Sequence, residues 1–404
     1  MTMIRSVLAM AALAFAGQIA QAAPQTYALD VQGGHLGGPG AAVLRGAAAE
    51  AQFVLFGEDH GFADSPVLLR ALAQEMRPLG FKHLVIEAGA RSTAMVADTL
   101  ARDGIPGVAR LVHDVPLGLP FLSLREDDEL IGDFLGRDAK GTPYLWGVDQ
   151  EFIGSPVFHL RRLVAIAPND AARAEAQRLL DAEQDAAAKA AQDKFLLSAA
   201  TPAQFDALAA LFQGQAEAQG IIADLKESAD IYQAWMHGHN YDNNAHRARY
   251  LAANFLRDYR AAAEPDAKVI FKMGIEHVAL GTTTNNTVDL GTLATMMARA
   301  NGHSALRIAF LPMGGHNVGF APKPGNPTAV EAYDPKEWGD IFKAAGLDPA
   351  QMPATGWTLL PLEPIRQALD TGGISKLSAE SRFLLLGFDY IITTRDAKPA
   401  TFLY

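Results

Sequence analysis

Six short apolar runs, separated by helical patterns, constrain the fold of this chain most strongly. The runs are Gln52–Phe56, His83–Ile86, Tyr144–Val148, Lys268–Met273, Arg307–Leu311 and Asp389–Thr393. Short strand-like runs that alternate with helical segments are typical of a parallel sheet with crossover helices. We therefore expect an α/β fold, in which a mostly parallel sheet is flanked by helices.

Two of the crossover helices can be placed from local signals. The pair Ser65-Pro66 predicts a helix start, because serine is a favourable N-cap and proline is tolerated at the first helical position. The apolar residues that follow have the spacing of one helix face; they are Leu68, Leu69, Leu72 and Met76. The segment Met95–Arg102 is predicted to be the next helix.

A long segment from Pro168 to about Arg260 contains no strand-like run. Alanine, glutamine, glutamate and lysine dominate it, and these residues have high helix propensity. A 404-residue chain is also long for a single hydrophobic core. We therefore expect an α-helical insertion, about residues 168–260, that forms a lid or cap on a hydrolase-like α/β domain spanning residues 24–404.

The N-terminal residues 1–22 have the pattern of a secretory signal peptide. Arg5 gives a positive start, Val7–Ala16 is an apolar core, and Ala20-Gln21-Ala22 is a cleavage site with small residues. The apolar run is shorter than the ~20 residues that a membrane-spanning helix needs. We therefore expect cleavage near Ala23 or Pro24, a periplasmic or secreted protein, and no membrane anchor in the mature chain.

Composition restricts the partners of the chain. The sequence contains no cysteine, which excludes disulfides, zinc–thiolate sites and a lipid anchor on cysteine. The formal net charge is −11, and phosphate binding requires a basic surface instead. The sequence therefore predicts a small-molecule or peptide substrate and no nucleic-acid partner.

Polar side chains follow four of the predicted strands at their carboxyl ends, the edge where open α/β sheets bind ligands. They are Glu58 and His60, Glu87, Asp149, and Glu276 and His277. Carboxylates and imidazoles together can bind a divalent cation, or can activate a water molecule between a base and an acid. We therefore predict that His60, Glu87 and His277 converge on one site.

Two of these strand ends share the spacing Gly-x-x-His. With 36 glycines and 11 histidines in the chain, about one such match is expected by chance. Three occur, at Gly57–His60, Gly80–His83 and Gly274–His277. The first and third follow an apolar run, where glycine lets the backbone turn and leaves the histidine at the sheet edge. This context favours a functional interpretation of His60 and His277.

Several segments resemble the erythromycin-esterase, ChaN-like and Tiki/TraB families. The run Gly80–Glu87 is similar to a Gly-Phe, apolar strand and glutamate pattern in the first two families. Arg247 and Leu251–Asn254 resemble a helix of the erythromycin esterases, and Lys268–Val278 resembles the strand and histidine loop that follow it. The C-terminal Phe388–Ile392 is similar to their last strand. The resemblance therefore implies the same fold over most of the mature chain.

The differences from the esterases concern the site. His60 follows Glu58 by two residues, as in ChaN-like and Tiki/TraB proteins, whereas the esterases have a spacing of three. Gly274-Ile275 and Ala248 stand where the esterases have His-Asn and Asp. The two Gly-x-x-His loops resemble Tiki/TraB proteins, which are associated with divalent-metal peptidase activity. The resemblance thus implies a hydrolase of the esterase or peptidase type, and not macrolide hydrolysis as such.

The strand ends and the resemblance together predict a set of catalytic residues: Glu58, His60, Arg70, Glu87, Arg247 and His277. In the version that we favour, Mn²⁺, Co²⁺ or Zn²⁺ is bound by His60, Glu87 and His277, and the other glutamate is the base. In the version without a metal, His60 is the general base and a glutamate orients it. One of the two arginines stabilises the charge that develops on the substrate carbonyl.

A non-enzymatic role is the alternative. ChaN-like proteins are associated with haem and iron uptake, and this role suits an exported protein. Haem requires a histidine, tyrosine or methionine ligand at an apolar surface, and the sequence does not select one. A Soret band on haem titration would favour this alternative over a hydrolase.

Two charged residues near the predicted site keep two interpretations each. Arg70 either reaches back to Glu58 or Glu87, or lies on the solvated face of its helix. Glu276 is equally compatible with a role in the site and with a loop role.

The predicted insertion holds two further groups of interest. Four residues look like a metal-binding cluster, namely His237, His239, Asp242 and His246. The glycine and asparagines among them favour a capping and loop role instead. Tyr232 and Trp235 line either a substrate cleft or the core of the insertion itself.

Overall fold

The structure is a computed structural model that describes residues 25–116, 118–319, 329–335, 338–353 and 355–403. The predicted signal peptide, residues 1–22, lies outside the described residues, so its cleavage and the export of the chain stay predictions. Within the described ranges, no helix combines the length and the apolar character needed to cross a membrane.

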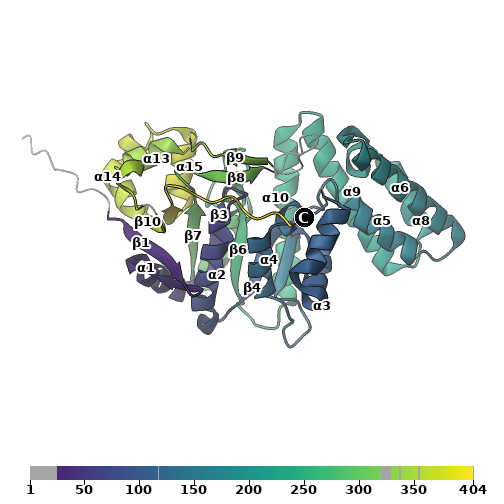
Figure 1. Ribbon diagram of the computed structural model, residues 1–404, viewed down its shortest axis with the longest axis horizontal. Helices are drawn as coiled ribbons and strands as arrows, with labels where there is room; N and C mark the ends of the chain where they lie inside the picture. Colours follow the sequence, from purple (N-terminus) through teal and green to yellow (C-terminus); the bar gives the residue numbers. More distant parts are fainter. Residues whose placement is uncertain (1–24, 117, 320–328, 336–337, 354, 404) are drawn as a thin grey trace, which may run out of the picture.

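A nine-stranded sheet forms the centre of the described chain (Figure 1). Its strands are β1 (Tyr27–Gln32), β2 (His35–Gly37), β3 (Ala51–Glu58), β4 (Phe81–Gly89), β5 (Leu145–Asp149), β6 (Lys268–Gly274), β7 (Ser304–Phe310), β10 (Trp357–Pro361) and β11 (Tyr390–Thr393). Their spatial order is β2-β1-β10-β11-β7-β3-β6-β4-β5. The six strands from β11 to β5 are parallel, and the other three form an antiparallel extension. The predicted mostly parallel α/β fold is confirmed.

All six predicted runs are strands of the parallel block, namely β3, β4, β5, β6, β7 and β11. The sequence did not predict the antiparallel strands β1, β2 and β10, nor a separate hairpin of β8 (His316–Gly319) and β9 (Ala329–Ala332). Most of these strands have at least one exposed or half-buried face, so they lack the continuous apolar run of a strand that is covered on both sides.

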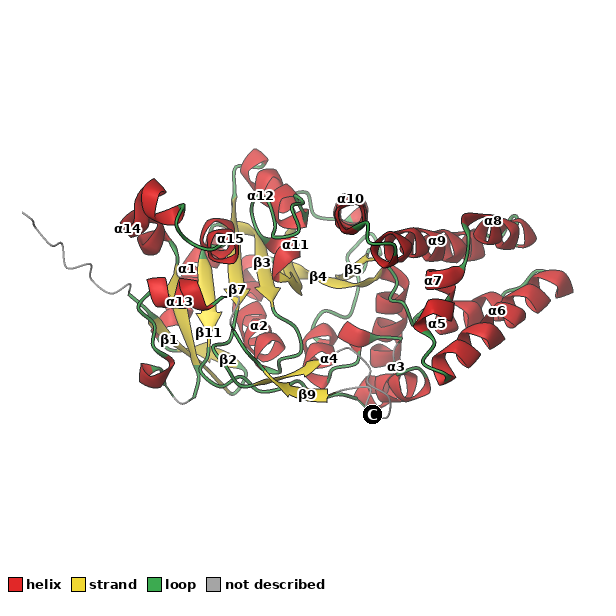
Figure 2. Ribbon diagram, turned by 90° about the horizontal axis from the view of Figure 1, so that it is seen from above, coloured by secondary structure: helices red, strands yellow, loops and turns green. Residues whose placement is uncertain are grey.

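Helices cover both faces of the sheet (Figure 2). The helices on one face are α1 (Pro39–Ala49), α2 (Asp64–Met76), α3 (Ala90–Asp114) and α4 (Arg125–Gly132), and those on the other face are α10 (Asn240–Ala261), α11 (Ile275–Val278), α12 (Leu290–Ala300), α13 (Gly339–Ala344), α14 (Glu363–Ile374) and α15 (Ala379–Gly387). Alternate residues of β3 supply the two cores: Val54 and Phe56 pack on the first layer, and Phe53 and Leu55 on the second. This alternation follows from the two-residue period of a strand.

The segment that we predicted as a helical insertion contains no strand among its described residues. It holds α6 (Asp170–Ala188), α7 (Leu196–Ala199), α8 (Pro202–Leu211) and α9 (Ala216–Met236), which with α5 (Pro156–Ala165) project beyond β5 (Figure 2). The structure differs at the C-terminal boundary, because α10 packs on the sheet. Leu251 and Phe255 belong to the second core, and the ring of Phe255 lies 5.9 Å from that of Phe53.

The start of α2 also differs from the prediction. The helix begins at Asp64, its N-cap residue is Ala63, and Ser65 lies within the first turn. The Ser65 hydroxyl does not cap the helix but donates a hydrogen bond to the Glu58 carboxylate. The serine therefore links the helix to the carboxyl end of β3.

Candidate functional site

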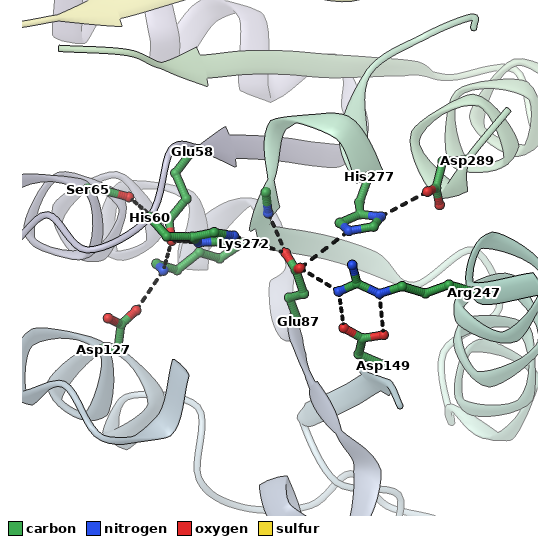
Figure 3. Close-up of polar contacts among 11 residues, drawn as sticks. Glu58, His60, Ser65, Glu87, Asp127, Asp149, Arg247, Lys272, His277 and Asp289 are labelled. Atoms are coloured by element: carbon green, nitrogen blue, oxygen red, sulfur yellow. Dashed lines mark hydrogen bonds and ion pairs between the residues drawn. The ribbon is translucent and has the colours of Figure 1, made fainter. Parts of the chain in front are cut away.

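The carboxyl ends of four adjacent strands bring the predicted site residues together. Because β3, β6, β4 and β5 are parallel neighbours, their ends lie at one edge of the sheet. The His60 Nε2 atom lies 3.5 Å from Glu87 Oε2, and His277 Nε2 lies 3.3 Å from Glu87 Oε1. Figure 3 shows both imidazoles pointing at this carboxylate from opposite sides. The structure thus places His60, Glu87 and His277 in one cluster.

Glu87 is the centre of this cluster. Its Oε1 atom accepts a hydrogen bond of 2.7 Å from Arg247 Nη2, and its Oε2 atom accepts one of 2.6 Å from the Gly274 backbone N–H. Burial alone would raise the pKa of this carboxyl, but the positive charges of His277 and His60 hold it well below its usual range. A carboxylate with four N–H neighbours is a weak base, so Glu87 is suited to bind and orient cations.

His60 is held between two carboxylates. Its Nδ1–H donates to Glu58 Oε1 at 3.0 Å, and its ring packs against the ring of Phe121 with the ring centroids 4.5 Å apart and the planes tilted by 36°. Burial would lower the pKa of His60, but Glu87 and Glu58 outweigh it and raise the pKa to about 10. A quarter of the His60 side chain remains exposed. The imidazole is therefore fixed in orientation and still reachable by a ligand.

Lys272 extends the site on the side of Glu58. Its Nζ atom lies 2.7 Å from Glu58 Oε1 and 2.6 Å from Asp127 Oδ1 on α4. Burial opposes ionisation of Glu58, but Lys272 and His60 lower its pKa to about 2. Burial raises the pKa of Asp127 to about 6, against the opposing effect of Lys272. Sequence reasoning missed Lys272, although a lysine inside the apolar run Lys268–Met273 was a signal that a buried anion must lie beside it.

Arg247 extends the site on the other side. Its Nε atom donates to Asp149 Oδ1 at 3.0 Å and its Nη2 atom also donates to the Asp149 carboxylate, which makes the pair bidentate. Burial disfavours the charged guanidinium, but Asp149 and Glu87 raise its pKa further. The hydrogen bonds of Arg247 in the described part of the chain use only Nε and Nη2, and no contact joins Nη1 to the other residues drawn in Figure 3. This N–H group is available to a ligand.

His277 has its own carboxylate partner. Its Nδ1–H donates to Asp289 Oδ2 at 2.9 Å, and Asp289 is also the N-cap of α12. Burial would lower the pKa of His277, but Glu87 raises it, with a further contribution from Asp289, to about 10. Sequence reasoning did not single out Asp289, because it lies 12 residues beyond His277 and after no strand.

Arg70 and Glu276 pair with residues outside the cluster. Arg70 was predicted as a catalytic residue, but its guanidinium donates to Asp133 at 2.7 and 3.2 Å and to Glu129 at 3.3 Å. It therefore links α2 to α4 and its neighbouring loop, and it reaches neither site glutamate. The Glu276 carboxylate accepts hydrogen bonds from Thr284, at 3.0 Å from the backbone N–H and 2.6 Å from the hydroxyl.

A cavity of about 1060 Å³ opens on the cluster. Glu58, His60, Glu87, Arg247 and His277 all line it. The outer wall is formed by residues of the loop before α4 and of α9 and α10, among them Phe121, Tyr232, Trp235, Asn240 and Asn244. The charged cluster thus lines a cavity of about the size that small-molecule sites have.

The predicted metal set does not fit this geometry. No three His, Asp or Glu side chains in the described ranges are arranged to hold a metal ion. In the predicted set, both oxygens of Glu87 accept N–H bonds, and the guanidinium of Arg247 already occupies the position beside this carboxylate where a cation would bind. His237, His239, Asp242 and His246 form no metal site either, and His246 pairs with Glu227 at 2.6 Å.

Neither a protein-family model nor a curated protein matches the sequence. Solved structures do match the fold. A mutant of the erythromycin esterase EreC in its open conformation matches with a TM-score of 0.55 and 15% identity, over 89% of this chain and 94% of that one. A succinoglycan biosynthesis protein matches with a TM-score of 0.52 and 12% identity, over 89% and 91% of the two chains. A Bacillus cereus protein has a TM-score of 0.50 and 13% identity, over 89% and 92%.

These identities show the fold alone. The chain has the fold of the erythromycin-esterase-like proteins, as the sequence resemblance implied.

Proposed function

We propose that this chain is an exported ester hydrolase that works without a metal, with His60 as its general base. One observation carries the proposal: the Nδ1 side of His60 is bound by Glu58, while its Nε2 side faces Glu87 and the cavity. A base whose second nitrogen is held by a carboxylate has its reactive nitrogen fixed toward the substrate. The fold supports this chemistry, because one of the solved structures that share it is an erythromycin esterase.

The proposed reaction uses the neutral form of His60. Its Nε2 atom takes a proton from a water molecule, and the water oxygen attacks the carbonyl carbon of the ester. The Nη1–H of Arg247 and the nearby imidazolium of His277 stabilise the negative charge that develops on the carbonyl oxygen. When the tetrahedral intermediate collapses, the C–O bond to the alcohol breaks and the leaving oxygen receives the proton from His60.

The charge network sets the conditions for this base. Since Glu87 and Glu58 raise the pKa of His60 to about 10, His60 is protonated in most molecules at neutral pH. The base form becomes available as the pH rises, so we expect hydrolysis to increase toward alkaline pH. Glu58 and Glu87 act as positioning residues in this scheme.

A panel of p-nitrophenyl esters and short peptides tests the proposal, with EDTA in every assay. We expect ester hydrolysis in EDTA, and its loss in His60→Ala and His60→Gln when circular dichroism shows that both variants are folded. Loss of activity in EDTA and its return with Mn²⁺, Co²⁺ or Zn²⁺ would overturn the metal-free mechanism. Cleavage of the peptides without cleavage of the esters would overturn the ester substrate and indicate a peptidase.

Haem titration tests the non-enzymatic alternative. The nitrogens of both site histidines face carboxylates, so an iron atom would have to break an existing ion pair to bind either one. We therefore expect no Soret band. A Soret band in a protein without esterase activity would favour haem binding.

A further inference from the structure

The outer wall of the cavity consists of aromatic and amide side chains. Tyr232 and Trp235 come from the C-terminal end of α9, and Asn240, Asn243 and Asn244 come from the start of α10. None of these side chains is an acid or a base of the charged cluster, although Tyr232 lies close enough to Asp149 and Arg247 to interact with both. The wall is therefore a distinct part of the cavity, available for the part of a ligand that does not react.

The turn between α9 and α10 explains why these residues meet. Gly238 has a φ of 78°, the left-handed conformation that glycine adopts without strain, and α10 begins two residues later. On α10, Asn240, Asn243, Asn244 and Arg247 have the i, i+3, i+4, i+7 spacing of one helix face. With a rise of 1.5 Å per residue, about 10 Å separates Asn240 from Arg247 along the axis. One helix face therefore runs from the outer wall to the reacting end.

Trp235 is the most prominent residue of this wall. It is 58% exposed although it lines a cavity, so its indole face can still be covered by a ligand. An aromatic face gains most from stacking on an apolar ring surface of matching size.

The asparagines supply the complementary polar groups. The side-chain amide of Asn240 makes no hydrogen bond within the described chain. Asn243 and Asn244 each use their Nδ2 group on a backbone carbonyl, so their Oδ1 atoms remain as acceptors. A ligand that carries hydroxyl groups around an apolar ring face would satisfy both the indole and the amides.

The charge of the cavity disfavours an anionic ligand. Besides the carboxylates of the cluster, Asp59, Glu276 and Glu380 line it. The cations that line it, Arg247 and the two histidines, are already paired with carboxylates. A neutral hydroxylated ring is therefore favoured over a carboxylated or phosphorylated one.

We propose that Trp235 and the asparagines of α10 form a subsite for a neutral sugar ring, and that the substrate is an O-acylated sugar. This inference rests on the proposed ester hydrolysis at His60. The ring stacks on the indole, and the ester extends along α10 toward Arg247. Binding energy from the ring then positions the ester for attack.

A comparison of two acetate esters, one with a sugar ring and one without, distinguishes ring binding from ester hydrolysis. We expect Trp235→Ala to lower kcat/KM for 6-O-acetylglucose by about tenfold, as expected for the loss of one stacking contact, and to leave ethyl acetate unchanged. Trp235→Phe should restore much of the loss, because it keeps an aromatic face. Tyr241→Ala is the matched control, since Tyr241 lies in the first turn of α10 and is 62% exposed but is not among the residues that line the cavity.

Tryptophan fluorescence separates binding from catalysis. We expect glucose to quench the emission of the wild-type protein but not that of Trp235→Phe. Quenching without hydrolysis of either ester would overturn the hydrolase and keep the subsite. Hydrolysis of both esters with an equal effect of Trp235→Ala on both, or with no effect on either, would overturn the subsite and keep the hydrolase. Neither quenching nor hydrolysis would overturn both.

Discussion

Replacing Glu87 with glutamine removes the negative charge that holds both site histidines in their protonated form. The carboxylate lies 3.5 Å from His60 Nε2, and two unit charges at about 4 Å interact with about 4 kcal/mol at an effective dielectric constant of 20. This energy corresponds to about 3 pKa units, and measured effects of a single opposite charge span about 1 to 3 units. The pKa of His60, about 10 in the wild type, should therefore fall to about 7 to 9 in Glu87→Gln.

The assay is the pH dependence of kcat/KM for an ester, from pH 6 to 10.5, with the uncatalysed rate subtracted. If His60 is the base, the rising limb of Glu87→Gln should lie about 1 to 3 pH units below that of the wild type. Glu276→Gln is the matched control, because Glu276 is adjacent to His277 but its carboxylate pairs with Thr284. The rising limb of this control should stay at the wild-type pH.

Two outcomes would refute this reasoning. A rising limb that does not move in folded Glu87→Gln would mean that Glu87 does not set the protonation of the base. Complete loss of activity at every pH would mean that Glu87 itself takes part in the chemistry. Urea denaturation must accompany the assay, because the glutamine amide would face N–H donors that now bind a carboxylate, at a cost of about 1 to 3 kcal/mol.

Three further predictions concern single residues and acid stability. His60→Ala should lower kcat/KM by about 10²- to 10⁴-fold, whereas His237→Ala, on the turn outside the cluster, should change it by less than about twofold; equal losses in an ester assay would contradict the assignment. Arg70→Ala should leave kcat/KM at the wild-type value because Arg70 pairs with Asp133 and Glu129, and a loss of activity without a loss of stability would return it to the site. Glu58 has a depressed pKa of about 2, so its contribution to stability is present above its unfolded pKa of about 4.5 and is lost as the pH falls through 2. Urea denaturation should therefore show that the free energy of unfolding decreases from pH 5 to pH 2.5, and that this decrease is smaller in Glu58→Gln than in the wild type.

The sequence predicted the strands of the parallel block and the position of the site residues for a common reason. A strand covered on both faces needs a continuous apolar run, as in Gln52–Phe56, and the polar residues that follow it must lie at the sheet edge. His60, Glu87 and His277 were found in this way although more than 180 residues separate the last two. Their convergence is a consequence of parallel strand order, which the alternation of strands and helices predicts.

The partners of these residues could not be predicted by the same reasoning. The sequence left Arg70 with two interpretations and predicted Arg247 from a resemblance, and only the packing of α2 against α4 and of α10 against the sheet shows which carboxylates each arginine binds. The metal set stays a prediction, and the described residues do not match it for a related reason. Histidines and carboxylates alone match a metal site, but Arg247 and the Gly274 N–H occupy the carboxylate oxygens, and their positions depend on tertiary structure.

The order in which the charged side chains pair explains why the fold determines the protonation states of the site residues. Negative and positive side chains alternate along one path, in the order Asp127, Lys272, Glu58, His60 and Glu87. At Glu87 the path divides: one branch continues to Arg247 and Asp149, and the other to His277 and Asp289. In a buried chain of this kind, each charge is stabilised by its neighbours, and removing one leaves the next unpaired. Residues at the rim of a site usually add few packing contacts and contribute little to stability. Since Glu87 and His277 are 6% and 8% exposed, their replacement must disturb folding as well as catalysis, and only a readout such as the pH profile separates the two effects.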